Sequence, residues 1–246
     1  MVSRLDAVSF DVHDQALVSA FWAGLLDREV VAEAADVALV PGDETQVGLR
    51  FERSASRQVG PRRLHLHLTS TSLEDQARTV ERVLDLGGRH FDAGQEQDAT
   101  FVVMADPEGN ELCVIEPGNS YLAGTGLLGE VSCDGTREVG LFWRDALGWP
   151  LVWEENDETA VQSPLGGTKV AWGGPPVEPQ HGRARQRFDL VTDDVAAETA
   201  RLVSLGASVV GDLEGLEEAA GAVELTDPDG TAFGLHPDAR VSRRSS

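Results

Sequence analysis

An internal repeat constrains the fold of this chain more than any other feature of its sequence. The pair Phe21-Trp22, in a helix-forming stretch, returns as Phe142-Trp143 after 121 residues (142 − 21). The string Asp-Pro-Glu-Gly at 106–109 returns as Asp-Pro-Asp-Gly at 227–230, again after 121 residues (227 − 106). Two unrelated segments that share one offset indicate a duplication. The chain is therefore predicted to consist of two similar halves.

Each half contains a shorter unit twice. In the first unit, residues 5–12 alternate apolar and polar side chains as a half-buried strand does, and a helical pattern over 16–26 follows. The later units begin near Leu64, Leu128 and Arg187. Further strands are predicted at 30–34, 38–41, 47–51, 100–104, 112–115, 151–153, 170–172, 223–225 and 233–235. The pattern indicates four βαβββ modules.

Glycine and polar residues mark the boundaries between these modules. The predicted halves are 1–118 and 127–246, joined by a linker at 119–126, and a second linker lies at 173–182. Gly87 and Gly206 suit left-handed positions that end helices. How the four modules pair within and between the halves is left open by the sequence.

The charge of the chain excludes two classes of partner. It has 42 acidic and 20 basic residues and a net charge of −22. Such a field repels phosphate backbones and anionic membrane surfaces, so neither nucleic acid nor a membrane is an expected partner. The basic end of the chain, with Arg240, Arg243 and Arg244, is too short to reverse this balance.

The two cysteines indicate a reducing compartment. Cys113 and Cys133 lack the CxxC spacing of a zinc or redox pair, and each is predicted to be a buried free thiol. The sequence also lacks a cleavable signal and a long apolar run. These features favour a cytoplasmic location. Whether the chain forms a homodimer is left open.

The string that begins at Asp106 has the chemistry of a tight turn. Asp106 can accept hydrogen bonds from the amides that follow it, Pro107 fixes φ, and Gly109 supplies a position with positive φ. Gly230 is its counterpart in the second half. We therefore predict structural turns here, and we predict that the Phe-Trp pairs pack their helices onto a sheet.

The Phe-Trp helix, together with the later strings DPEGNELCVIEP and DPDGTAFGLHP, resembles the glyoxalase-like branch of the vicinal oxygen chelate (VOC) superfamily, which includes bleomycin-resistance-type proteins. The resemblance covers nearly the whole chain, twice over. It implies an α+β fold in which four βαβββ modules pair into two VOC domains. Each domain would have a cupped mixed β-sheet, helices on its convex face and a ligand cleft on its concave face.

Strand alternation predicts which side chains face these clefts. On 5–12 the apolar residues contact the helix, so Ser9 and Asp11 face the other way. The same rule applied to the remaining strands predicts a binding surface in the first half formed by Ser9, Asp11, Arg50, Glu52, His65, His67, Glu111 and Cys113. In the second half it predicts Leu128, Glu130, Ser132, Lys169, Arg187, Asp189, Gly234 and His236.

The resemblance also implies positions for metal ligands. Metal-dependent relatives use a histidine on the first strand of each module and a carboxylate near the end of the last strand. Matching positions in this chain are Ala7, His65 and Cys113 in the first half, and Leu128, Arg187 and Gly234 in the second. Leucine and glycine cannot bind an ion, and arginine repels one. We therefore expect no cofactor in the second half, while a divalent metal around His65 in the first half is left open.

Two functions from different classes fit these patterns. The sequence lacks GxGxxG, GxxxxGK[ST], GxSxG and HExxH, the usual marks of hydride transfer, phosphoryl transfer and hydrolysis. The first function is metal-free binding of a small organic molecule, as in resistance or sequestration. The alternative is a lyase, an isomerase or another VOC enzyme that uses a site around His65, with His65, Glu111 or Glu52 as acid or base. A scaffold without a ligand is also left open.

Charged residues in the predicted second cleft suggest a ligand class. Arg187 and Lys169 would receive an anionic or carbonyl-bearing part of the ligand. Trp153 or Trp172 would supply a stacking face, although strand alternation places Trp172 on the helix side. The alternative is that these cations form internal ion pairs with strand neighbours of opposite charge.

Overall fold

The computed structural model describes residues 3–55, 62–96, 98–177, 184–211 and 221–238. The basic end of the chain and part of the linker at 173–182 lie outside these residues. No helix in the described part of the chain is long and apolar enough to cross a membrane.

The predicted α+β class and the four βαβββ modules are confirmed. Module one contains β1 (Arg4–Val12), α1 (Gln15–Leu26), β2 (Val31–Ala34), β3 (Val37–Val40) and β4 (Gly48–Arg53). Module two contains β5 (Leu64–Leu68), α2 (Leu73–Asp85), β6 (Arg89–His90), β7 (Val102–Ala105) and β8 (Glu111–Val114). Module three contains β9 (Leu128–Cys133), α3 (Arg137–Leu147), β10 (Leu151–Glu155), β11 (Glu158–Gln162) and β12 (Lys169–Trp172). Module four contains β13 (Gln186–Thr192), α4 (Val195–Leu205), β14 (Ser208–Val209), β15 (Val223–Thr226) and β16 (Ala232–Pro237).

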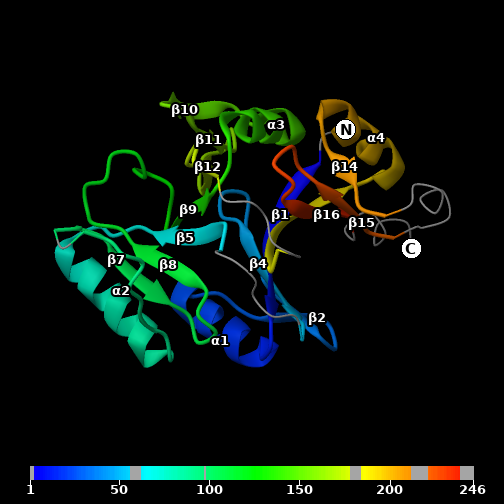
Figure 1. The fold of residues 1–246 in the computed structure, drawn as a ribbon. Helices are drawn as coiled ribbons and strands as arrows, with labels where there is room; N and C mark the ends of the chain where they lie inside the picture. Colours follow the sequence, from blue (N-terminus) through cyan, green and yellow to red (C-terminus); the bar gives the residue numbers. More distant parts are fainter. Residues whose placement is uncertain (1–2, 56–61, 97, 178–183, 212–220, 239–246) are drawn as a thin grey trace.

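The sheets combine modules from opposite halves of the sequence (Figure 1). One sheet has the order β14-β15-β16-β13-β1-β4-β3-β2, and it joins modules one and four. The other has the order β10-β11-β12-β9-β5-β8-β7-β6, and it joins modules two and three. We call them the 1/4 sheet and the 2/3 sheet. The halves predicted from the repeat therefore do not each close a sheet of their own.

The helices, in contrast, pack against the helix of the other module in the same half of the sequence. In Figure 1, α1 lies beside α2 at one end of the molecule, and α3 and α4 lie at the other. In the first half, Arg82 Nη2 of α2 donates to the Gly24 carbonyl of α1 at 2.9 Å. In the second half, Arg201 Nη2 of α4 donates to the Ala146 carbonyl of α3 at 2.7 Å. Each half is thus held together through its helices, while its two strand sets belong to different sheets.

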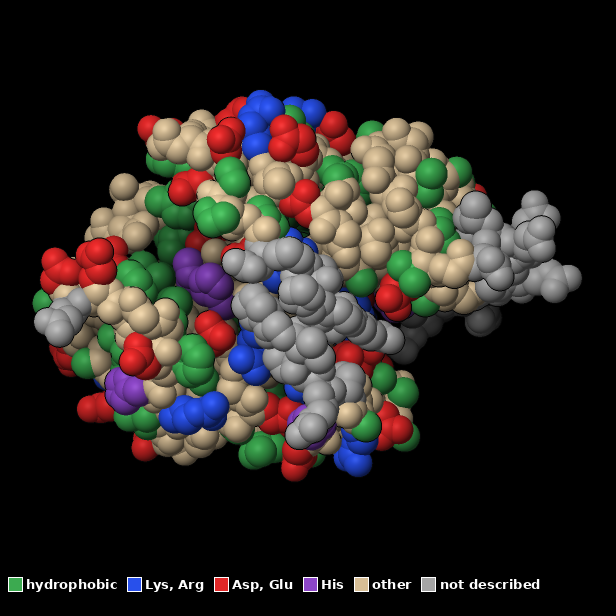
Figure 2. Space-filling view, viewed as in Figure 1, with side chains coloured by type: hydrophobic (Ala, Val, Ile, Leu, Met, Phe, Trp, Pro, Cys, Tyr) green, Lys and Arg blue, Asp and Glu red, His purple; other side chains and the backbone are tan. Residues whose placement is uncertain are grey.

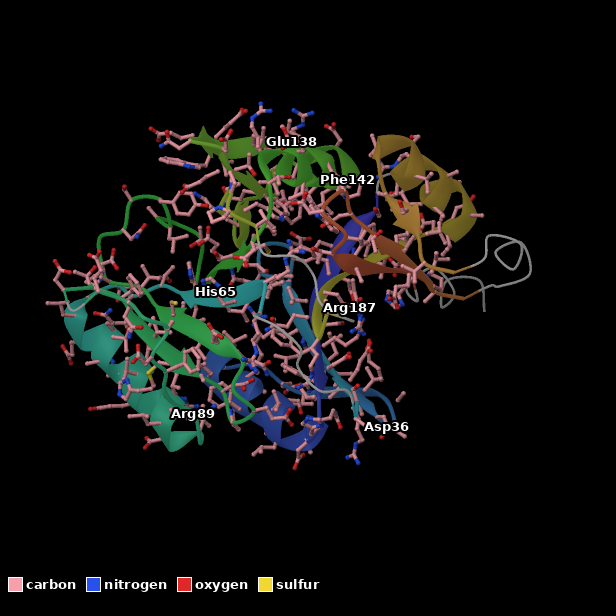
Figure 3. The ribbon with its side chains drawn as sticks, in the orientation of Figure 1. Asp36, His65, Arg89, Glu138, Phe142 and Arg187 are labelled. Atoms are coloured by element: carbon pink, nitrogen blue, oxygen red, sulfur yellow. The ribbon has the colours of Figure 1, made fainter. Side chains whose placement is uncertain are left out.

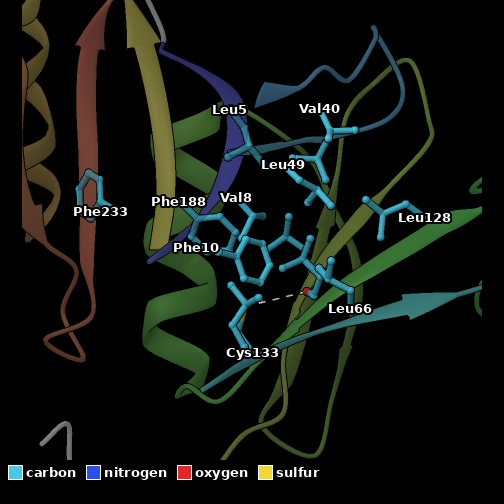
Figure 4. Packing of buried hydrophobic residues seen from close by; sticks show 14 of the residues in the cluster. Leu5, Val8, Phe10, Val40, Leu49, Leu66, Leu128, Cys133, Phe188 and Phe233 are labelled. Carbon is cyan, nitrogen blue, oxygen red and sulfur yellow. Dashed lines mark hydrogen bonds between the residues drawn. The ribbon is translucent and has the colours of Figure 1, made fainter. Parts of the chain in front are cut away.

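The hydrophobic core is continuous between the two sheets (Figure 4). Phe10 of β1 and Leu66 of β5 belong to one buried cluster, and so does Leu128 of β9. The prediction that Leu128 faces a cleft is wrong, because the pairing of β5 with β9 shifts register between His67 and Leu68, and Leu68 pairs with Leu128. The extra residue turns the Leu128 side chain into the core.

The two repeated motifs are hydrogen-bonded to each other. The indole nitrogen of Trp22 donates to Asp106 Oδ2 at 3.1 Å, and that of Trp143 donates to Asp227 Oδ2 at 3.2 Å. Both tryptophans are fully buried, as predicted for packing residues. Burial raises the pKa of Asp227 to about 6 against the opposing hydrogen bonds from Thr231 and Trp143. The helix of one module is thereby fastened to the last turn of its neighbour in sequence.

The same turns also cap the helices that they reach. Glu108 accepts from the amides of His13 and Asp14 at 2.9 and 2.6 Å, just before α1 begins. Asp229 accepts from the amide and hydroxyl of Thr136, the N-cap of α3, at 2.6 and 2.9 Å. A carboxylate at this position satisfies amides that have no partner within the helix. The turns are structural, as predicted, and they join modules as well as strands.

Candidate functional site

The concave faces of the two sheets present different residues at equivalent positions. In the 1/4 sheet, Ser9 pairs in register with Arg50, and Asp189 pairs with Gly234. In the 2/3 sheet, Glu130 pairs with Lys169, and His67 pairs with Cys113. By strand order and register the equivalent positions are Ser9 and Glu130, Arg50 and Lys169, Asp189 and His67, and Gly234 and Cys113.

In the 1/4 sheet, Arg50 is at the centre of a charge network. Its Nη1 lies 2.5 Å from Asp189 Oδ2. Its Nε lies 2.8 Å from Glu33 Oε2, and its Nη2 lies 3.1 Å from Asp6 Oδ2. Every nitrogen of the guanidinium is therefore paired with a carboxylate of the same sheet. At least three of the five N–H donors of Arg50 are therefore committed within the sheet.

Arg187 is neutralised in the same way. Its Nη1 lies 2.7 Å from Asp11 Oδ1, and its Nη2 bonds to Glu52. Asp189 also accepts from the Ser9 hydroxyl. Burial alone would raise the pKa of Asp189, but the hydrogen bond from His236 and the charge of Arg50 hold it well below its usual value. For Arg187, the internal ion pairs expected as the alternative to ligand binding are present.

A cleft of about 420 Å³ adjoins this network. Among the described residues that line it, none is Phe, Tyr or Trp, and the lining includes Arg4, Asp6, Glu33, Arg50, Glu52, His236 and Asp238. Charges that are already paired in a network gain little from a further partner. The cleft of the 1/4 face is thus bordered by charges that are already paired and by no aromatic ring among its described lining residues.

In the 2/3 sheet, a buried carboxylate orients a histidine. His67 Nδ1 lies 2.5 Å from Glu130 Oε2, and the Tyr121 hydroxyl donates to Glu130 Oε1 at 2.7 Å. Burial lowers the pKa of His67, but hydrogen bonds with Cys113 and Glu130 outweigh it and raise the pKa to about 9. At neutral pH, His67 is therefore an imidazolium held in place by Glu130.

His65 has the opposite protonation state. Its ring centroid lies 4.8 Å from that of His67 on the same face of β5. Burial and the charge of His67 lower the pKa of His65 to about 4. One strand thus presents a neutral and a protonated imidazole side by side.

An open cleft lies on this face of the 2/3 sheet. Its lining consists of Tyr121, Glu130, Ser132, Trp153, Glu158, Thr159, Ala171, Trp172 and Gly173, and its volume is about 320 Å³. We call it the tyrosine cleft. Figure 2 shows histidine side chains over β5 next to a hollow with hydrophobic walls.

Aromatic rings form one wall of the tyrosine cleft. Tyr121 and Trp153 meet edge to face, with ring centroids 5.6 Å apart and an interplanar angle of 79°. Lys169 Nζ lies 4.0 Å from the centroid of the Tyr121 ring and donates to the Tyr121 carbonyl at 2.5 Å. The ammonium is thereby committed to Tyr121. Trp153 remains 39% exposed.

The predicted shared site of Arg187 and Lys169 is wrong. Arg187 lies on β13 of the 1/4 sheet and Lys169 on β12 of the 2/3 sheet, and Figure 3 shows Arg187 in a different sheet from His65. Trp153 and Trp172 both border the cleft, but the Trp172 ring is buried and stacks on Trp143 of α3, with centroids 6.4 Å apart. The helix-side position predicted for Trp172 is confirmed.

Glu111 and Tyr121 complete the surroundings of this face. Glu111 forms an ion pair with Arg62, whose Nη1 is 3.6 Å from Glu111 Oε1, and its role as an acid or base stays a prediction. Tyr121 was not predicted as a site residue, because it lies in the predicted linker at 119–126. Its one available signal was composition, since it is the single tyrosine of the chain.

Three donors of the 2/3 face are grouped closely enough to hold an ion. Ligand atoms of His65, His67 and Cys113 lie within 4.8 Å of one another. A metal requires imidazole lone pairs, so an ion there would have to displace the proton of His67, which is bonded to Glu130. The positions matched to family ligands in the second half do not even share a cleft, because Leu128 lies in one sheet and Arg187 and Gly234 lie in the other.

Two cupped mixed sheets built from four βαβββ modules define a protein of the tandem VOC class. The family model for the glyoxalase-like domain matches residues 7–115 and 130–236, so the chain belongs to the glyoxalase-like domain family. These segments fall within the predicted halves.

Solved structures with a similar fold include two proteins that also span nearly the whole chain. Glyoxalase I from Zea mays is 13% identical, with a TM-score of 0.67, and the match covers 98% of this chain and 95% of that chain. A proposed dioxygenase from Bacillus subtilis is 14% identical, with a TM-score of 0.62, and the match covers 97% and 86%. At these identities the likeness concerns the fold. No curated protein sequence matches the chain.

Proposed function

We propose that this protein binds a small planar organic molecule in the tyrosine cleft without a metal, as proteins of the resistance or sequestration type do. The observation that carries this proposal is the open wall formed by Tyr121 and Trp153. Ligand sites are typically concave and aromatic, with a few polar groups that fix orientation. The cleft on the equivalent face of the 1/4 sheet borders the paired side chain of Arg50 and has no Phe, Tyr or Trp among its described lining residues.

Trp153 is the group that a ligand would cover. An indole that is 39% exposed at the mouth of a cleft retains apolar surface, and a stacked ring would remove that surface from water. Ser132 and Glu158 line the same space and can hydrogen-bond to the edge of a ligand. Glu130 and Tyr121 are already bonded to each other, so they shape the floor of the cleft.

The polarity of the cleft favours a neutral or cationic ligand over the anionic one expected from the sequence. The expectation rested on Arg187 and Lys169 acting together, and they lie in different sheets. The Lys169 ammonium is bound to Tyr121, while Glu158 adds negative charge to the lining. The net charge of −22 also attracts cations over a longer range.

Enzymatic function in the manner of glyoxalase I receives less support from this geometry. Of the family positions for metal ligands, Ala7, Leu128 and Gly234 cannot coordinate an ion, and Arg187 repels one. His65 and Cys113 remain, with His67 beside them, and His67 is bonded to Glu130. Metal-free binding in the tyrosine cleft needs none of these donors, whereas a metal enzyme would depend on all three.

Calorimetric titration with two matched probes tests this proposal. We expect 9-aminoacridine, a planar cation, to bind with a stoichiometry of one, and 9-anthracenecarboxylate to bind at least about tenfold more weakly, or about 1.4 kcal/mol. Trp153→Leu should weaken the binding of 9-aminoacridine at least about tenfold. Trp149→Leu, outside the cleft, and Glu33→Gln, on the 1/4 face, should leave it unchanged.

The opposite pattern would exclude the tyrosine cleft as the site. Binding that survives in Trp153→Leu but is lost in Glu33→Gln would move the site to the 1/4 sheet. A stoichiometric ion released by a chelator, together with loss of binding after its removal, would favour the metal-dependent alternative.

A further inference from the structure

Cys113 lies beside His67 but outside the lining of the tyrosine cleft. The strands β5 and β8 are parallel neighbours, and their register places Cys113 directly across from His67. The ring nitrogen of His67 and the sulfur of Cys113 lie within 4.8 Å of each other. The thiol is therefore held against an imidazole by the sheet itself, which fixes the pair more firmly than two loops would.

The imidazole is oriented by a third group. Glu130 Oε2 lies 2.5 Å from His67 Nδ1, and Glu130 is 4% exposed. The Tyr121 hydroxyl holds the other carboxylate oxygen at 2.7 Å. A nucleophile beside an imidazole that a buried carboxylate orients is the general arrangement of an activated nucleophile. Cys113, His67 and Glu130 lie in this order, with the imidazole in its protonated form.

The second cysteine of the chain lacks this environment. Both cysteines are buried, with Cys113 7% and Cys133 8% exposed, but among the hydrogen bonds of the described residues the Cys133 thiol contacts only the Val131 carbonyl, at 3.9 Å. Burial raises the pKa of the Cys133 thiol well above its usual value. The position equivalent to Cys113 in the 1/4 sheet is Gly234, which has no side chain. The arrangement is thus particular to the 2/3 sheet.

Apolar side chains surround the Cys113 thiol. Val103, Ile115 and Leu122 form a small buried cluster with it, and Tyr121 packs against that cluster. Ile115 and Leu122 also line a surface depression of about 570 Å³. Cys113 itself is not part of this lining, so the depression borders the cluster and does not reach the thiol directly.

We propose that Cys113 is a nucleophile that captures apolar organic electrophiles with a conjugated carbon–carbon double bond, such as α,β-unsaturated carbonyl compounds. This activity goes beyond reversible binding in the tyrosine cleft, and it does not depend on that binding.

The addition balances without a further reagent. The Cys113 thiol gives its proton to solvent as its sulfur forms a bond to the β-carbon, and the π electrons of the double bond move toward the carbonyl oxygen. The resulting enolate takes a proton at the α-carbon from the imidazolium of His67, which regains one from solvent. A proton and the sulfur have then added across the double bond, with no oxidant and no leaving group. Acyl transfer would in addition need donors for an oxyanion and a protonated leaving group.

Alkylation of the full chain tests the proposal. N-phenylmaleimide, an apolar acceptor, is added to native protein treated with EDTA, and adducts are followed by intact mass and peptide mapping. We expect one adduct, on Cys113, formed at least about tenfold faster than any adduct on Cys133. Cys113→Ser should abolish it, and Cys133→Ser should leave its rate unchanged. His67→Gln and Glu130→Gln, each checked for a native circular dichroism spectrum, should slow it at least about tenfold.

Other results would overturn the proposal. They are modification of Cys133 first, no adduct on the native parent, or an unchanged rate in a folded His67→Gln protein. If the variants fail to fold, the unsubstituted protein still tests the proposal, because the alkylation rates of Cys113 and Cys133 can be compared within one molecule. Protection of Cys113 by equimolar zinc without EDTA would instead place an ion on these donors. Trp153→Leu should keep the parent rate, which separates this result from failure of the tyrosine cleft.

Discussion

The two concave faces have the same strand order, but they line their clefts with different kinds of side chain. On the 1/4 face, Arg50 and Arg187 are closed in by carboxylates of their own sheet. On the 2/3 face, the equivalent position holds Lys169, which turns to Tyr121 and leaves an aromatic wall open. The difference shows that helix-side residues maintain the fold while cleft-side residues are free to specialise. Each concave face of such a chain therefore has a chemistry of its own.

The largest expected effect comes from removing the central cation of each face. Arg50→Met leaves Asp189, Asp6 and Glu33 without their shared partner, and we expect the free energy of unfolding to fall by about 3 to 5 kcal/mol. Lys169→Met leaves one backbone carbonyl and one ring, so the expected loss is about 1 kcal/mol. Urea unfolding followed by circular dichroism measures both. Equal losses would contradict a network confined to the 1/4 sheet.

A smaller effect concerns the pH dependence of stability, which should have opposite signs for the titrating groups of the two faces. The pKa of His67 is raised from 6.5 to about 9, so its contribution to stability is fully present below pH 6.5 and is lost as the pH rises through 9. The loss is at most about 3 kcal/mol. The lowered pKa of Asp189 acts in reverse, because its contribution is present above the usual carboxyl range and is lost in acid.

Unfolding curves between pH 6.5 and 9.5 check this expectation. The parent should lose stability over this interval, and His67→Gln should show a flatter dependence. If the two curves have the same slope, His67 is not protonated in the folded protein. A free imidazole would then be available, and the fit of an ion to this face would need to be revised.

The smallest expected difference concerns the two repeated turns. Gly109 and Gly230 have φ values of +85° and +78°, which β-branched residues resist. Gly109→Val and Gly230→Val should each cost about 1 to 3 kcal/mol. A Cβ at Gly109 would lie 2.9 Å from Arg89 Nη2. At Gly230 no heavy atom of the described residues other than its chain neighbours would lie within 4 Å of the Cβ, so Gly230→Val should be the milder change. Thermal melting compares them, and a neutral result at both would contradict the turn assignment.

Local patterns were sufficient to predict the elements but not their partners. Alternation and glycine stops depend on neighbours in sequence, and the predicted strands and helices agree with those observed. The pairing of β1 with β13 could not be predicted, because β1 would present the same alternation to a partner in its own half. Leu128 shows the same limit, since one register shift reversed its face.

The candidate site was predicted only in part for the same reason. Strand alternation selected His67, Glu130 and Cys113 individually, but it could not bring β5, β8 and β9 together. Tyr121 lies in an irregular segment where no period applies. Arg187 and Lys169 were grouped because they share a half, and the sheets separate them.

The crosswise assembly of sheets and helices makes each half an incomplete folding unit. Ala7 of β1 pairs with Asp189 of β13, 182 residues away (189 − 7), and this pair closes the centre of the 1/4 sheet. Contacts between such distant residues carry a high loop-closure cost before they return any stability, and they slow folding. Two chains severed in the 119–126 segment would therefore behave as complementary fragments, each carrying half of two sheets and gaining its structure from the other.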